Sequence, residues 1–376
     1  MAALITLIPL AVVGCGTSEP RQVAVALTSA VVEAPTLEIT PAAGAAGLPA
    51  STEIGTTVGD GSIAEVLLVD AAGTRIGGGL REDGTSWVPE RALDYDRSYT
   101  ATVTASGAGG TTTQTTTFTT MAKPTGSRIG TSLYLTTGRT YGVAMPVVVT
   151  FKADIPAEAR AQVQRRLFVH SEPAQSGAWR WFGARSVLYR PESYWKPGTT
   201  ITVRAALSGL PIGKRFGDTD RAATVSIGRD LHIDVNNATK RMSVIQDGQV
   251  IKTIPVSLGK ASTPSSSGTT VIISKFKSTI FDTTQTDGPD GYRIQVSNAQ
   301  RLTWGGEFIH SAPWSVGDQG RRNVSHGCIN VSPSNASWLF GKTLIGDPVT
   351  TRGTRRKLAA GNGWTVWNMS WPEYIS

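Results

Sequence analysis

Cysteine and charged residues are scarce in this sequence. The 376 residues include two cysteines, Cys15 and Cys328, which lie too far apart to form part of a disulfide framework. Asp, Glu, Lys and Arg together make up 17% of the chain, which excludes long charged helices. The fold must therefore be stabilised by packing, and we expect each cysteine to have its own role.

The amino terminus carries an apolar run that is too short to cross a membrane. Residues Ala2–Gly14 are uncharged and fall short of the ~20 residues that a transmembrane helix needs, so they match the apolar part of a signal peptide. The run ends in Val12-Val13-Gly14-Cys15, which resembles a bacterial lipobox. We predict a lipoprotein signal peptide over 1–14, lipidation of Cys15 and a polar tether over 15–35. The alternative is a buried apolar start with an incidental cysteine.

The net charge is positive but dispersed. Lys and Arg number 36 against 28 Asp and Glu, which gives +8 at pH 7. Such a balance favours anionic surroundings, and the absence of a Lys/Arg block favours a cell envelope over nucleic acid.

Alternating strands and abundant turn residues indicate a mainly β protein. Glycine occurs 41 times and proline 20 times, and Ser98–Ala105 alternates apolar and polar residues with the period of a half-buried strand. The turn and strand of Leu93–Val103 are repeated in Tyr194–Val203. We therefore predict two tandem β-sandwiches, over 36–121 and 124–228.

Two short helices and a third unit complete the expected organisation. Alternation resumes in Leu231–Val235 and marks the start of a β-rich domain near residue 230. Within it, Ser332 followed by Pro333 predicts the start of a helix. A second helix is expected within Ile155–Arg166, with Pro156 at its first position.

Cys328 lies in a cluster suited to acyl transfer. Ser325-His326-Gly327-Cys328-Ile329-Asn330 places a thiol beside a histidine, and His310 precedes this segment by a gap of fourteen residues. A thiol attacks as thiolate, and a nearby imidazole lowers its pKa and accepts its proton. Gly327 permits a turn whose N–H groups stabilise an oxyanion, and Asn330 shares a face with Cys328 if the segment is extended.

Two other roles are compatible with these residue types. Cys328 could be an inert buried thiol, although two histidines and a glycine are unusual neighbours in a core. His310, His326 and Cys328 could bind zinc. However, His326 and Cys328 are closer in sequence than in common zinc motifs, and the sequence shows no fourth ligand. We expect no metal and no other cofactor.

The cluster resembles the signature of the L,D-transpeptidases, which cross-link bacterial peptidoglycan. Val256–Lys260, Ser262–Pro264 and Phe308–Gly317 extend the resemblance. It implies a catalytic domain of the YkuD type over 230–352, with the two sandwiches as immunoglobulin-like domains, as in the multi-domain actinobacterial branch. A C-terminal tail subdomain over 353–376 would carry tryptophans that we expect to pack rather than to bind sugar: Trp364, Trp367 and Trp371.

Position by position, the resemblance implies a role for each residue of the cluster. Cys328 would be the nucleophile and His310 the general base, with the backbone carbonyl of Ser311 orienting the imidazole. Gly327 and Cys328 would supply oxyanion N–H groups, and His326 would line the oxyanion hole.

Five further residues are implied at the substrate. Asn330 would bridge its neighbours and the substrate, and Tyr292 would wall the donor cleft. Phe281 falls at the position of a lid residue, and Trp314 and Ser325 would also contact the substrate.

The implied reaction is acyl transfer. Cys328 would attack a donor tetrapeptide stem of peptidoglycan, D-alanine would leave, and the amine of an acceptor diamino acid would resolve the thioester into a 3→3 cross-link. Carbapenem β-lactams would bind covalently, and the protein would be exported and lipid-anchored at the outer face of the plasma membrane. One rival is an L,D-carboxypeptidase or endopeptidase, in which water resolves the thioester. Another is a non-catalytic cell-wall-binding lipoprotein.

Overall fold

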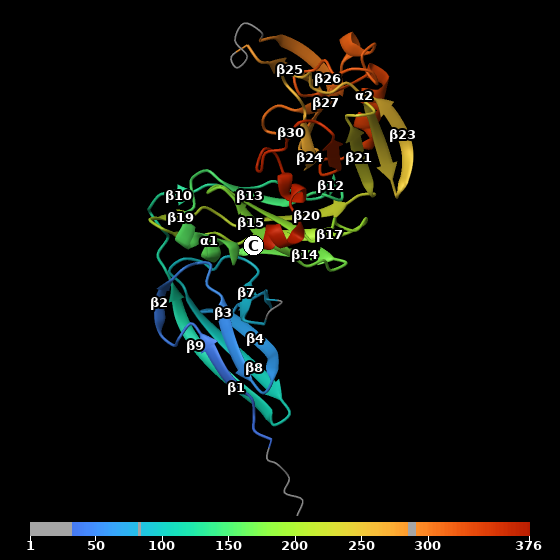
Figure 1. The fold of residues 1–376 in the computed structure, drawn as a ribbon. Helices are drawn as coiled ribbons and strands as arrows, with labels where there is room; N and C mark the ends of the chain where they lie inside the picture. The colour runs from blue at the N-terminus through green and yellow to red at the C-terminus, as the bar shows by residue number, and fades with distance from the viewer. Residues whose placement is uncertain (1–31, 82–83, 285–290) are drawn as a thin grey trace, which may run out of the picture.

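A computed structural model describes residues 32–81, 84–284 and 291–376. The predicted signal peptide, Cys15 and most of the predicted tether lie outside the described residues. Within the described ranges, no helix is both long and apolar enough to span a membrane. Figure 1 shows the β-rich units in succession, with the blue sandwich at one end and the orange unit at the other. The predicted mainly β fold class, with two sandwiches before a third β-rich unit, is confirmed.

The first sandwich consists of two sheets. One has the order β1 (Thr36–Thr40), β3 (Ile54–Gly59), β7 (Ser86–Pro89) and β6 (Gly78–Leu80). The other has the order β2 (Ala45–Leu48), β9 (Gly110–Thr120), β8 (Ser98–Gly107), β4 (Ser62–Asp70) and β5 (Arg75–Ile76). In β8, every second residue from Tyr99 to Ala105 is buried, as the alternation predicts. The Tyr99 ring stacks on Phe118 at 5.8 Å in the core.

The second sandwich repeats the arrangement with smaller additions. One main sheet has the order β11 (Thr131–Leu133), β13 (Val147–Phe151), β16 (Ser186–Pro191) and β15 (Gly177–Phe182). The other has the order β12 (Thr140–Tyr141), β20 (Arg221–Ile227), β17 (Thr200–Ala205) and β14 (Leu167–Glu172). A small third sheet joins β10 (Arg128–Ile129), β19 (Arg215–Gly217) and β18 (Pro211–Ile212).

The helix predicted in the second sandwich is present as α1 (Ala157–Gln164). Pro156 is the N-cap residue and not the first helical residue as we predicted, because its ψ of 143° is extended. The Trp195 indole is buried and donates to Met145 O at 2.8 Å.

The third unit packs two sheets around its own core. The larger sheet has the order β23 (Gln249–Pro255), β22 (Arg241–Gln246), β21 (Leu231–Asn236), β29 (Pro348–Arg352), β24 (Ser266–Val271) and β30 (Arg356–Lys357). The smaller sheet has the order β25 (Ser274–Asp282), β26 (Arg293–Arg301), β27 (Phe308–Ser311) and β28 (Ile329–Val331). Apolar residues of β21, β22, β27 and β28 meet in the core between the sheets.

The predicted helix after Cys328 is α2 (Pro333–Lys342), and Ser332 Oγ caps it by accepting from Asn335 N. Ala336 and Leu339 direct its apolar face into the core of the third unit.

The C-terminal tail packs against the second sandwich. It contains η3 (Thr365–Asn368) and α3 (Trp371–Ile375), and Figure 1 shows the red tail lying against the green strands. Trp364 is buried in the core of that sandwich, with Trp367 and Trp371 packed against it. The prediction that these tryptophans serve packing is confirmed.

Candidate active site

Two short parallel strands place the histidine and the cysteine next to each other. β27 pairs with β28 so that His310 lies opposite Asn330, and Cys328 immediately precedes β28. Ile309, Ile329 and Val331 point into the core. Since side chains alternate along a strand, His310 and Asn330 point the other way, with Cys328 on the same side.

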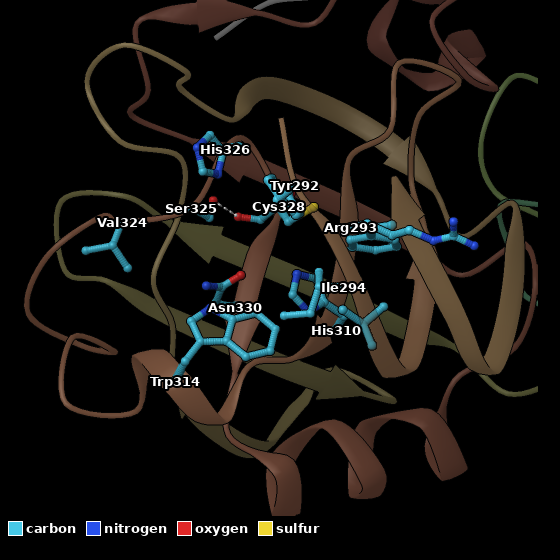
Figure 2. A pocket seen from close by; sticks show the side chains of 12 residues that line it. Tyr292, Arg293, Ile294, His310, Trp314, Val324, Ser325, His326, Cys328 and Asn330 are labelled. Atoms are coloured by element: carbon cyan, nitrogen blue, oxygen red, sulfur yellow. Dashed lines mark hydrogen bonds between the residues drawn. The ribbon is translucent and has the colours of Figure 1, made fainter. Parts of the chain in front are cut away.

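The side chains of this face line a cavity of about 550 Å³. Figure 2 shows the labelled residues around it. The cavity collects seven of the residues singled out from the sequence: Phe281, Tyr292, His310, Trp314, Ser325, His326 and Asn330, beside Cys328. Trp314 is 54% exposed on the 3-10 turn η2 (Pro313–Ser315), where its ring lies 6.0 Å from that of His310.

The imidazole is held by the backbone carbonyl that the resemblance implies. His310 Nδ1 lies 2.9 Å from Ser311 O, so Nδ1 carries the hydrogen and Nε2 is left as the proton acceptor. Burial lowers the pKa of His310 below its ordinary value of 6.5, and the bond to Ser311 opposes that shift. The imidazole is therefore a neutral base near pH 7.

Burial raises the pKa of the Cys328 thiol to about 12. The N–H of Phe308 opposes this shift and the charge of Glu307 adds to it. The sulfur contacts Gly306 O at 3.6 Å and makes no hydrogen bond to His310 among the described residues. The sequence-based expectation of a thiol with a lowered pKa is therefore wrong for this state. In this state the thiol therefore keeps its proton at neutral pH.

The turn before Cys328 requires glycine. Gly327 has a φ of +130°, a conformation that side chains rarely adopt, although a Cβ atom there would meet only ordinary contacts. Its N–H donates to Ser325 Oγ at 3.1 Å, and Ser325 Oγ donates to Cys328 O at 2.6 Å. The N–H of Gly327 that we predicted for the oxyanion is thus already engaged. The N–H of Cys328 has no acceptor among the described residues and remains available.

Asn330 presents a polar atom to the cavity. Its Nδ2 donates to the buried Ser315 Oγ at 3.0 Å. Its Oδ1 is buried and has no hydrogen-bond partner within the described ranges. A buried acceptor of this kind is costly unless it is paired.

His326 lies at the exposed edge of the site. Lys260 Nζ lies 3.1 Å from His326 Nε2, which makes that nitrogen the acceptor, and the Tyr292 ring lies 5.2 Å from the imidazole. Phe281 packs against the rings of Phe308 and His310, at 4.6 and 5.1 Å.

Comparison with known proteins shows two family matches. The profile described as "Bacterial Ig domain" matches residues 45–211, and that of the "L,D-transpeptidase catalytic domain" matches residues 230–350. L,D-transpeptidase 2 of Mycobacterium tuberculosis is 33% identical over 391 residues, with 99% of this chain and 93% of the relative covered. The chain belongs to the L,D-transpeptidase family.

Other members of the family are similar over most or part of the chain. L,D-transpeptidase 5 of M. tuberculosis is 34% identical, with 91% of this chain and 77% of the relative covered. An L,D-transpeptidase structure in complex with imipenem has a TM-score of 0.51 and 32% identity, covering 60% of this chain and 99% of that one. L,D-transpeptidase 3 of M. tuberculosis with a faropenem-derived adduct has a TM-score of 0.50 and 30% identity, covering 60% and 98%. These matches do not test our domain boundaries, which stay predictions.

The cavity of this L,D-transpeptidase family member includes residues that the sequence analysis missed: Arg293, Ile294, Val296 and Val324. Tyr292, Ile294 and Val296 are spaced by two residues, so the strand period could have identified the latter two once Tyr292 was chosen. Ser315 had no local signal, because its role depends on Asn330 from a distant strand. Among the described residues, no group of three His, Cys, Asp or Glu side chains is arranged to hold a metal.

Proposed function

We propose that this member of the family is a cysteine acyltransferase acting on peptidoglycan stem peptides. The observation that supports it best is that His310 on β27 and Cys328, directly before the adjacent strand β28, face one cavity. As Sγ attacks the carbonyl carbon that precedes the terminal D-alanine of a donor tetrapeptide, its proton passes to His310 Nε2. His310 then protonates the leaving amine, D-alanine departs, and a thioester remains.

Two neighbouring groups are suited to bind the donor during this step. The free N–H of Cys328 is placed to stabilise the oxyanion, and Asn330 Oδ1 to accept an N–H of the donor. An acceptor diamino acid amine then attacks the thioester and gives its proton to His310, which returns it to the thiolate. The new amide bond is a 3→3 cross-link.

A pair of synthetic stem peptides tests this function. With a tetrapeptide donor and an acceptor stem, the full chain should release one D-alanine for each cross-linked dimer, measured by mass spectrometry. The Cys328→Ala variant should do neither. Release of D-alanine by a folded Cys328→Ala variant would contradict the proposal.

The hydrolytic rival shares the site and differs in the product. If D-alanine appears without a dimer at high acceptor concentration, water resolves the thioester and the protein is a carboxypeptidase. We favour transfer because the cavity walls include apolar side chains, Ile294, Val296 and Trp314, which limit water at the thioester.

We also propose that the chain works outside the cell, anchored through Cys15 to the plasma membrane. The lipobox-like sequence at Cys15 and the family assignment support this location. Replacing Cys15 with serine should abolish lipid attachment, detected as the loss of acyl mass and of membrane partitioning. A natural protein with no lipid on Cys15 would contradict the anchor.

A further inference from the structure

A buried carboxylate lies directly behind the turn that carries the nucleophile. Glu307 has a side chain that is 10% exposed, and it follows Gly306, whose carbonyl contacts the thiol. A Cβ atom on Gly327 would lie 3.8 Å from Glu307 Cγ, so the acid packs against this turn. The proposed mechanism gives Glu307 no part, although a negative charge at this position opposes formation of a thiolate.

Arg356 neutralises this carboxylate from the far end of the larger sheet. Its guanidinium donates to Glu307 Oε1, and its Nε donates to Ser266 Oγ at 3.1 Å. Arg356 lies on β30, which pairs in parallel with the start of β24 at Ser266. The catalytic family profile ends at residue 350, so this cation comes from the segment beyond the matched domain.

The start of β24 connects the pair to both sides of the thiol. Ser266 N lies 3.2 Å from each oxygen of Glu307, and Ser266 Oγ donates to Oε1 at 2.8 Å. The adjacent Ser265 Oγ donates to Gly327 O at 2.7 Å. The adjacent residues Ser265 and Ser266 therefore bond both to the segment that holds Glu307 and to the turn before Cys328.

We propose that Arg356 is a positioning residue for Cys328: by pairing with Glu307 it removes an opposing charge from behind the thiol and so permits the thiolate to form. This inference rests on the proposed role of Cys328 as the nucleophile. The proposal gives the segment after residue 350 a role in the chemistry of Cys328 as well as in packing.

Other charged and titratable groups also surround the thiol. His310 faces it from β27, His326 precedes it in the chain with Lys260 beyond, and Tyr292 and Arg293 line the cavity from the start of β26. Burial is the main cause of the raised pKa of the Cys328 thiol, and the charge of Glu307 adds to it. An unpaired Glu307 would therefore oppose the thiolate more strongly than it does in the natural protein.

The test is the pH profile of alkylation at Cys328 in the full chain. Iodoacetamide reacts with the thiolate, and mass spectrometry of the Cys328 peptide reads this site separately from Cys15. Arg356→Gln should move the profile to higher pH by about half to one unit, which lowers the rate about three- to tenfold where it follows the thiolate fraction. Glu307→Gln should move the profile to lower pH, and the double variant should return close to the natural profile.

Two further variants separate charge from packing. Arg356→Lys keeps the charge and should stay close to the natural profile. Arg352 on β29 forms an ion pair with Asp234, with 3.0 Å between the charged groups, and this pair does not involve Glu307. Arg352→Gln should therefore leave the profile unchanged. A purely structural role predicts lower thermal stability in Arg356→Gln with no shift of the profile, and no recovery in the double variant. An unshifted profile in Arg356→Gln would overturn the proposal, and so would a shifted profile that the double variant does not restore.

Alkylation does not depend on acyl transfer, so the two proposals can fail separately. The expected shifts without any D-alanine release would support the role of Arg356 and contradict the proposed function. Normal cross-linking by the natural protein with an unmoved profile in Arg356→Gln would contradict the role of Arg356 alone.

Discussion

Burial acts in opposite directions on the two ionisable groups that line the cavity at β27 and β28. It raises the pKa of Cys328 to about 12 and lowers that of His310, so both groups are uncharged at neutral pH. An uncharged pair costs less to bury than an ion pair would. If Cys328 is the nucleophile, as we propose, its thiol must lose its proton during the attack.

The pH dependence of acylation should follow the imidazole. His310 accepts a proton only when it is neutral, and its pKa lies below 6.5, so the rate of carbapenem acylation should fall only as the pH drops below that value. From there the rate should stay level through about pH 8, because the thiol pKa is far higher. Mass spectrometry of samples quenched at successive times gives the acylation rate at each pH.

A matched variant gives the control for this profile. His310→Gln removes the base and should slow acylation by about 100-fold or more, with no acid limb. An acid limb centred above pH 6.5 in the natural protein, or an unchanged rate in the variant, would show that another group is the base.

At the scale of elements, α2 supports the strand that carries His310. Ala336 and Leu339 pack into the same core as Ile309, the residue before His310. The helix begins where a capping serine and a proline predict it, because both act locally on the first turn.

Removal of the α2 cap should cost stability and leave the chemistry intact. Ser332 Oγ accepts from Asn335 N at 3.4 Å, so Ser332→Ala should lower the free energy of unfolding by about 0.5–2 kcal/mol. Ser337→Ala, on the exposed face of the same helix, should change it by less than about 0.5 kcal/mol. Urea unfolding measures both, and equal effects of the two substitutions would refute a capping role.

Local patterns predicted the mainly β class, the strands at Ser98–Ala105 and Leu231–Val235, α1, α2 and the residues of the turn at Cys328. Those features depend on side-chain alternation, caps and a short motif, all of which are visible within about ten residues. The engagement of Gly327 N–H by Ser325, the support of Asn330 by Ser315 and the Glu307–Arg356 pair were not predictable. Each depends on which strands pair and which turns meet, and that pairing leaves no signal in the local sequence.

Across the whole molecule, charged side chains join the units to one another. Glu53 of the first sandwich pairs with Arg81 of its own unit and with Arg166 of the second. Arg190 of the second sandwich, 2% exposed, lies under the tail, with its guanidinium over the rings of Trp367 and Tyr374 at 4.6 and 4.4 Å. These contacts join the first sandwich to the second, and the second sandwich to the tail.

Loss of the Arg190 contact should detach the tail. Arg190 also donates to Met369 O at 3.1 Å, so Arg190→Ala removes cation–π contacts and a charged hydrogen bond together. We expect a loss of about 2–4 kcal/mol in the free energy of unfolding and faster proteolysis of the tail. Arg185→Ala, which breaks an exposed pair with Asp154, should cost at most about 1 kcal/mol. Protection of the tail in Arg190→Ala would contradict this arrangement.

The covalent state of Cys328 after exposure to a carbapenem tests the central claim most directly. The strained ring should acylate the sulfur, so intact-mass measurement should show one added drug mass, mapped by digestion to the peptide that contains Cys328. The adduct should be absent in Cys328→Ala and slow to form in His310→Gln. An adduct on a serine, or an undiminished adduct in folded Cys328→Ala, would contradict a cysteine mechanism.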